Sequence, residues 1–100
     1  MPELTIVYWR DIPAQVIVGK GRKAEKRILP ARFEQAIDRC AMQVGARDTD
    51  AYLADWRRAD PVAREGDPTA LVEAEAARID AEYDGARLKA LIDASGWETA

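Results

Sequence analysis

The densest group of side chains able to bind a ligand lies between positions 20 and 27. Five cations are interrupted there only by Glu25 among charged residues: Lys20, Arg22, Lys23, Lys26 and Arg27. Ammonium and guanidinium groups in such a run bind phosphate oxygens, whether of a nucleic acid or of a smaller phosphorylated ligand. The same charges also suit a solvated turn that leads into a protected edge strand. The Gly-x-x-x-x-Gly-Lys-Ser/Thr pattern of a phosphate-binding loop is missing, so both interpretations stay open.

A second candidate is the pair Trp9-Arg10, which follows an apolar segment. An arginine can hold a carboxylate while a neighbouring indole ring stacks on an apolar group. Trp residues are also enriched among the anchors of protein interfaces. In the alternative interpretation, Trp9 is buried under a helix or at a subunit contact. Arg10 then pairs with Asp11 or with an acidic helix.

Catalysis by imidazole or by several thiolates is excluded, because the chain has no histidine and one cysteine. It cannot form a Ser-His-Asp triad, a histidine-bearing metal site or an internal disulfide. Cys40 falls on an apolar stripe, where a thiol is not activated. The carboxylates between positions 73 and 84 follow the polar face of a helix. We therefore predict no catalytic residues, no metal site and no cofactor.

Two β-branched segments must position the candidate residues. Residues 4–9 and 14–19 predict two strands joined by Arg10–Pro13, and residues 23–29 predict a third strand at the edge. Alternation along the first strand separates two faces, with Leu4, Ile6 and Tyr8 on one and Thr5, Val7 and Trp9 on the other.

The second face of these strands is a predicted docking surface. A single layer of helices covers one face of a sheet and leaves the other to be covered by a protein partner or by a second copy of the chain. The expected anchors are Val7, Trp9 and Ile17, with Arg10 and the basic turn around them.

The remaining residues predict helices. Apolar positions at helical spacing and capping signals define segments at about 30–44, 49–56, 67–83 and 86–94. Residues 57–66 are polar and predict a connector, with a short fourth strand around Val62 as an option. The chain is thus predicted to be an α+β domain: a small antiparallel β-meander of two to three strands followed by three to four helices packed on one face.

The length of 100 residues predicts a single domain over 1–100, with the meander at about 4–29 and the helical part at about 30–95. The net charge of −3 is uneven, since the first half is net basic and the second half strongly acidic. This acidic balance disfavours nucleic acid as a partner. No apolar run is long enough to span a membrane, and the cysteine count predicts a cytoplasmic protein.

The run Tyr8-Trp9-Arg10-Asp11-Ile12-Pro13-Ala14-Gln15-Val16-Ile17 resembles the signature of a small bacterial family, the virulence factor domain. The similarity continues at Gly21-Arg22-Lys23, Leu29-Pro30-x-Arg32-Phe33, Ala36-Ile37-Asp38 and Asp50-Ala51-Tyr52-Leu53-x-x-Trp56-Arg57. It covers most of residues 4–58. The resemblance implies no enzymatic activity and no catalytic residues. It implies an accessory protein that accompanies folate- and corrinoid-linked one-carbon methyl-transfer enzymes.

Three functions follow from these observations. The first is a non-catalytic accessory protein that binds a protein partner or a second copy through the sheet. The second is a binder of phosphate-bearing ligands or nucleic acid through the basic turn at 20–27. The third is an enzyme, or an enzyme subunit, of the methyl-transfer context. It is disfavoured because carboxylates, arginine or tyrosine would have to act with a borrowed cofactor.

Overall fold

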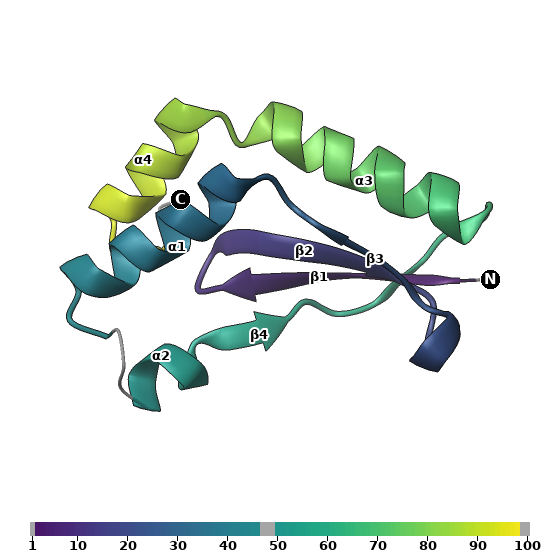
Figure 1. Cartoon of the computed structure of the whole chain (residues 1–100), viewed down its shortest axis with the longest axis horizontal. Coiled ribbons are helices and arrows are strands. Elements are labelled where there is room, and N and C mark those ends of the chain that lie inside the picture. Colours follow the sequence, from purple (N-terminus) through teal and green to yellow (C-terminus); the bar gives the residue numbers. More distant parts are fainter. Residues whose placement is uncertain (1, 47–49, 99–100) are drawn as a thin grey trace.

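An N-terminal hairpin forms the centre of the sheet. In the computed structural model, which describes residues 2–46 and 50–98, β1 (Glu3–Trp9) pairs antiparallel with β2 (Ile12–Val18) (Figure 1). The turn is tighter than expected, because Trp9 opposes Ile12 and only two residues connect the strands. Pro13 therefore lies inside β2. On the opposing strand, the pairing register shifts between Val7 and Tyr8. Such a β-bulge is typical where a proline leaves one strand without a backbone N–H donor.

The chain continues the sheet on the far side of β2. A 3-10 turn (Gly21–Lys23) leads to β3 (Glu25–Ile28), which pairs antiparallel with β2 at the sheet edge. The predicted third strand is thus confirmed.

The sheet is larger than the predicted meander of two to three strands. After the first helix the chain returns to the free edge of β1, where β4 (Trp56–Arg58) and β5 (Val62–Ala63) both pair with it antiparallel. The order is β3-β2-β1-β4, with β5 also on β1, which gives five strands. The optional strand near Val62 is present. The Trp-Arg-Arg strand was predicted as a helix end and connector, since it has no apolar alternation.

Local signals set the helix boundaries. α1 (Ala31–Gln43) starts after Pro30, α3 (Pro68–Glu82) after Asp67, and α4 (Gly85–Asp93) after Asp84. The carboxylates of Asp67 and Asp84 accept hydrogen bonds from backbone N–H groups three residues later, as N-caps do. α2 spans Asp50–Ala54, so the predicted start at Thr49 lies outside the described residues.

Three helices form one layer over the sheet. α3 packs along β2 and β3, α1 packs against the other end of β2, and α4 packs on α1 (Figure 1). Phe33 and Cys40 of α1, Val72 and Ile79 of α3 and Leu91 of α4 are buried in one hydrophobic core with residues of β1 and β2. The α+β class is confirmed. α2 lies apart from this layer beside β4, and within the described residues no helix is long and apolar enough to cross a membrane.

Candidate functional site

The structure places Trp9 inside the molecule, and the prediction that it anchors a partner from a free sheet face is wrong. Its side chain is 0% exposed and belongs to the hydrophobic core. The indole Nε1 donates to the carbonyl oxygen of Tyr52 at 2.9 Å, and the two rings lie 5.8 Å apart. The α2–β4 segment therefore covers this end of the second face, which confirms the alternative in which Trp9 is buried.

Arg10 is also engaged within the chain rather than placed beside an interface. Its Nε lies 3.0 Å from Asp55 Oδ2, and its Nη1 donates to the carbonyl oxygen of Ser95 at 2.5 Å. The guanidinium lies between the rings of Trp9 and Trp97, and the side chain is 14% exposed. Arg10 thus joins the hairpin turn to two distant segments, so it does not frame a docking surface.

Asp11 completes this structural junction. Its carboxylate accepts from Arg57 Nη2 at 2.8 Å and from the backbone N–H of Glu98 at 2.6 Å. The Nε of Arg57 donates to the carbonyl oxygen of Arg10 at 3.0 Å. Folding therefore brings Arg57 to Arg10, but these two cations are held by carboxylates and carbonyl groups and form no open anion site.

Val7 and Ile17 do lie on the second face, as the alternation predicted, but both are buried. Val7 opposes Gln15 of β2 and Arg58 of β4, and Ile17 opposes Lys26 of β3. Long polar side chains surround the two residues on these neighbouring strands. Neither is an exposed anchor, because the neighbouring strands on both sides leave little of either side chain accessible to a partner.

The five predicted anion-binding residues are divided by the fold. Successive side chains of a strand point to opposite faces, so Lys26 and Arg27 diverge. Arg27 reaches Glu73 of α3 at 2.6 Å, on the helix side. Arg22 and Lys23 lie in the exposed 3-10 turn. The run at 20–27 is therefore not a single basic patch.

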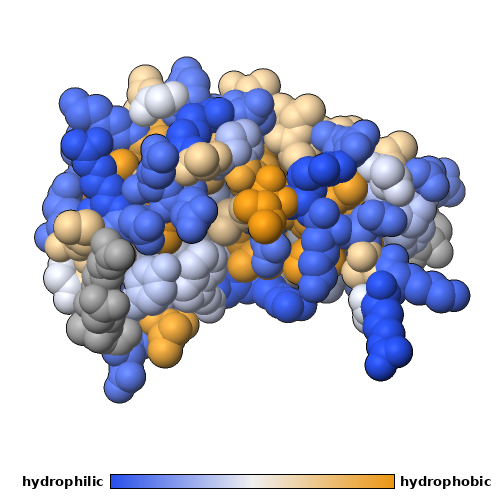
Figure 2. Space-filling view, viewed as in Figure 1, coloured by the Kyte–Doolittle hydropathy of each residue, from blue (hydrophilic) through white to orange (hydrophobic). Residues whose placement is uncertain are grey.

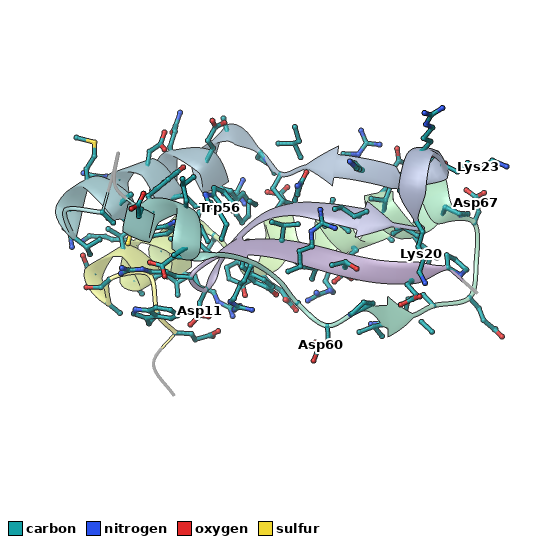
Figure 3. All side chains as sticks on the ribbon, turned by 90° about the horizontal axis from the view of Figure 1, so that it is seen from below. Asp11, Lys20, Lys23, Trp56, Asp60 and Asp67 are labelled. Atoms are coloured by element: carbon teal, nitrogen blue, oxygen red, sulfur yellow. The ribbon has the colours of Figure 1, made fainter. Side chains whose placement is uncertain are left out.

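A basic groove nevertheless lies on the second face. It has a volume of about 410 Å³, and its cationic lining is Lys20, Lys26 and Arg58. Lys20 Nζ lies 2.8 Å from Glu3 Oε1, which neutralises part of this charge. Arg58 comes from β4, so the sequence run could not indicate it. Figure 3 shows Lys20 at the opposite end of the sheet from Trp56.

An apolar, aromatic pocket opens at the other end of this face. It has a volume of about 250 Å³ and is lined by residues from β2, β3, the β3–α1 connection, α1, α2 and β4: Ala14, Gln15, Ile28, Leu29, Glu34, Ile37, Asp38, Tyr52 and Trp56. The rings of Tyr52 and Trp56 meet edge to face at 6.0 Å, and both are half-buried. Figure 2 shows apolar atoms at the surface where β3 leads into α1.

Two features of this pocket suit a partner side chain. Ile28 is 76% exposed and Leu53 on neighbouring α2 is 69% exposed, so aliphatic surface lies beside the aromatic rings. Glu34 and Asp38 stand one helical turn apart on α1, and neither forms an ion pair with a described residue. The sequence signal was present in the apolar side chains at 52, 53 and 56, but it predicted helix packing instead.

Cys40 and Glu75 lie in environments that stabilise the fold rather than activate the side chains. Cys40 is buried, and this burial raises the pKa of its thiol, which keeps the thiol protonated and unreactive. Glu75 accepts hydrogen bonds from Arg78, which lowers the pKa of the Glu75 carboxyl. The described part of the chain contains no group of three or more Cys, Asp and Glu that could hold a metal ion.

A comparison with family models shows to which family the chain belongs. The model of a family described as virulence factor matches residues 7–92, which is most of the chain. The chain belongs to the virulence factor family. No curated protein and no solved structure matches it.

The matched region of this virulence factor chain contains the aromatic pocket, and it contains Arg10 and Asp11 but not the C-terminal residues that they contact. The run from Tyr8 to Pro13 forms the junction: Trp9 and Ile12 are fully buried, while Arg10 and Asp11 hold the α2–β4 segment and the C-terminal segment. The run that suggested the family thus stabilises the fold. Ala14 and Gln15, which follow in the longer run that resembles the family signature, line the pocket.

Proposed function

We propose that this virulence factor chain is a non-catalytic accessory protein that docks another protein through the part of the second sheet face that α2 leaves open. The observation that carries the proposal is the pocket between β3, α1 and β4, where exposed Ile28 adjoins the half-buried ring of Trp56. Contiguous apolar surface with aromatic residues marks interaction sites in soluble proteins. Glu34 and Asp38 at its rim favour a partner segment that carries an apolar side chain next to lysine or arginine.

The context of the proposal is one-carbon metabolism in the cytoplasm. The resemblance of the sequence to the virulence factor family supports an association with folate- and corrinoid-linked enzymes. The single, buried thiol supports a cytoplasmic location. A non-catalytic role is supported by the surroundings of Arg10, Glu75 and Cys40, whose contacts stabilise the fold.

Site-specific crosslinking in the native cell tests the docking surface. We expect p-benzoylphenylalanine at position 28 to give one dominant covalent adduct with a protein, identified by mass spectrometry. The same group at position 89, on the exposed side of α4, is the matched control and should not give this adduct. Trp56→Ser should reduce the adduct at position 28 by about tenfold or more, because it removes a central aromatic anchor.

Two results would overturn the docking proposal. One is the absence of any adduct at position 28, and the other is the same adduct from positions 28 and 89. Far-UV circular dichroism and thermal unfolding of Trp56→Ser must match those of the parent, so that a weaker adduct reports weaker docking rather than an unfolded chain.

A second candidate function is supported by the basic groove. Lys26 and Arg58 line it from opposite edges of the sheet, and neither forms an ion pair with a described residue. We expect a short fluorescein-labelled oligothymidylate to bind more weakly as sodium chloride rises. In Lys26→Gln/Arg58→Gln the slope of log affinity against log salt should fall by about 0.7 for each phosphate that is no longer neutralised. A salt-independent affinity would exclude phosphate binding by this groove.

A further inference from the structure

We infer that the part of the second sheet face that α2 leaves open joins two copies of this chain in an antiparallel pair, with the basic groove of each copy over the aromatic pocket of the other. This inference rests on the proposed docking function and names the occupant of the docking face. It identifies the partner segment, apolar and basic, as the start of β3 and the preceding turn of a second copy.

Charge is separated along the face in the direction of the strands. Gln15 lines the pocket and Ile17, two residues on in β2 and on the same face, lines the groove. Glu34 and Asp38 lie at the pocket end, and Lys20 and Lys26 lie at the groove end. Figure 3 shows this length of sheet from Trp56 at one end to Lys20 at the other.

Three of these charges have no counter-charge within the described residues. Lys26, Glu34 and Asp38 take part in no ion pair there, whereas most other cations that extend from the sheet and helices do, such as Arg27, Arg32 and Arg78. Lys20 contacts Glu3 in an exposed pair, and exposed pairs contribute little stability. The face thus carries opposite, uncompensated charges at its two ends.

A two-fold symmetric pair can place the basic end of each face on the acidic end of the other. Two copies that meet face to face are related by a two-fold axis in the plane of the interface. An axis along the strands would place like charges together. An axis across the strands reverses the strand direction and keeps β3 on the same side, so Lys20 and Lys26 of each copy meet Glu34 and Asp38 of the other. The contact occurs twice, and both occurrences are favourable.

Apolar contacts follow from the same arrangement. The β3 strand of one copy lies over β3 of the other in the opposite direction, which sets Ile28 over the aliphatic stem of Lys26. Direct pairing of the two β3 edges into a continuous sheet is disfavoured, since it would bring Lys26 and Arg27 of both copies together. Packing by the face is therefore favoured over packing by the edge.

Charge-reversed variants of the purified chain test this pairing by sedimentation equilibrium at low salt. One variant, Glu34→Lys/Asp38→Lys, makes both ends basic, and the other, Lys20→Glu/Lys26→Glu, makes both ends acidic. We expect the parent to form dimers and each variant alone to dimerise about 100-fold more weakly, because like charges then meet twice. Mixing the two variants should restore the dimer, since every contact in the mixed pair joins opposite charges.

The matched control is Arg39→Glu/Lys89→Glu on the helix layer, which changes the same amount of charge and should dimerise like the parent. A parent chain that stays monomeric at millimolar concentration would overturn the pairing, and so would a mixture of variants that stays monomeric. Failure of the pairing can be distinguished from failure of the docking function, because a crosslink from position 28 to a different protein would still support docking. A crosslink to a second copy that the charge variants do not alter would contradict the antiparallel arrangement.

Discussion

Trp9→Ala should lower the free energy of unfolding by about 3–5 kcal/mol, the range for truncation of a large buried aromatic side chain. Trp9 is 0% exposed and packs on the ring of Tyr52, so alanine leaves a cavity that the surrounding β1, β2 and α2 residues cannot fill. The carbonyl oxygen of Tyr52 also loses its indole donor. A loss of this size is a large fraction of the stability of a small domain.

Urea denaturation followed by far-UV circular dichroism measures this effect without relying on tryptophan emission. The matched control is Trp97→Ala, since Trp97 is 47% exposed and its ring lies against the guanidinium of Arg10. We expect the control to lose about 1 kcal/mol or less. If Trp9→Ala kept the parent stability and lost only dimerisation, Trp9 would be an interface anchor after all and the burial described above would be contradicted.

Gly96→Ala should lower the free energy of unfolding by about 2–4 kcal/mol, from a left-handed backbone and an overpacked site together. Gly96 has φ +88°, and a Cβ there would lie 2.9 Å from Arg10 Cδ and 3.2 Å from Cys40 Sγ. Arg10 cannot yield easily, since its guanidinium is held by Asp55 and Ser95. The backbone of Gly96 is also fixed, because its carbonyl accepts from Asp11 N at 2.8 Å.

Gly21→Ala separates the two contributions. Gly21 also has a positive φ, +65°, but nothing lies within 4 Å of a Cβ built there. Its substitution should therefore cost only the backbone term, about 1 kcal/mol. Urea denaturation of both variants tests this comparison, with each loss of unfolding free energy calculated from the shift in midpoint and the slope of the parent. Equal losses at the two positions would show that Gly96 is not tightly packed against Arg10.

The elements with local signals were predictable from the sequence. Asp67-Pro68 places a cap and a proline at the start of α3, and the apolar spacing of Phe33, Ile37 and Cys40 predicts α1. The hairpin strands were predicted from β-branched residues. These features depend on contacts between residues that are close in the chain, which is why periodicity and capping identify them.

The candidate site was less predictable, since its residues meet over long separations. The pocket joins Ile28, Glu34 and Trp56, and the basic groove takes Arg58 from a strand more than thirty positions after Lys26. β4 has no recognisable pattern of its own, because its stability comes from hydrogen bonds to β1. The exposure of the expected anchors was mispredicted because it also depends on long-range contacts. The strand alternation placed Val7 and Ile17 on the correct face, but residues of neighbouring strands bury them.

The sequence by itself determined the α+β class, most element boundaries, the family and the absence of histidine chemistry. Only the tertiary structure decided that Trp9 and Arg10 are internal, that the basic run divides at β3, and that a pocket opens between β3, α1 and β4. The physical reason is that exposure and charge pairing belong to the packed chain. Trp9 looks free beside its neighbours in sequence, and it is buried because Tyr52, 43 positions later, returns to cover it.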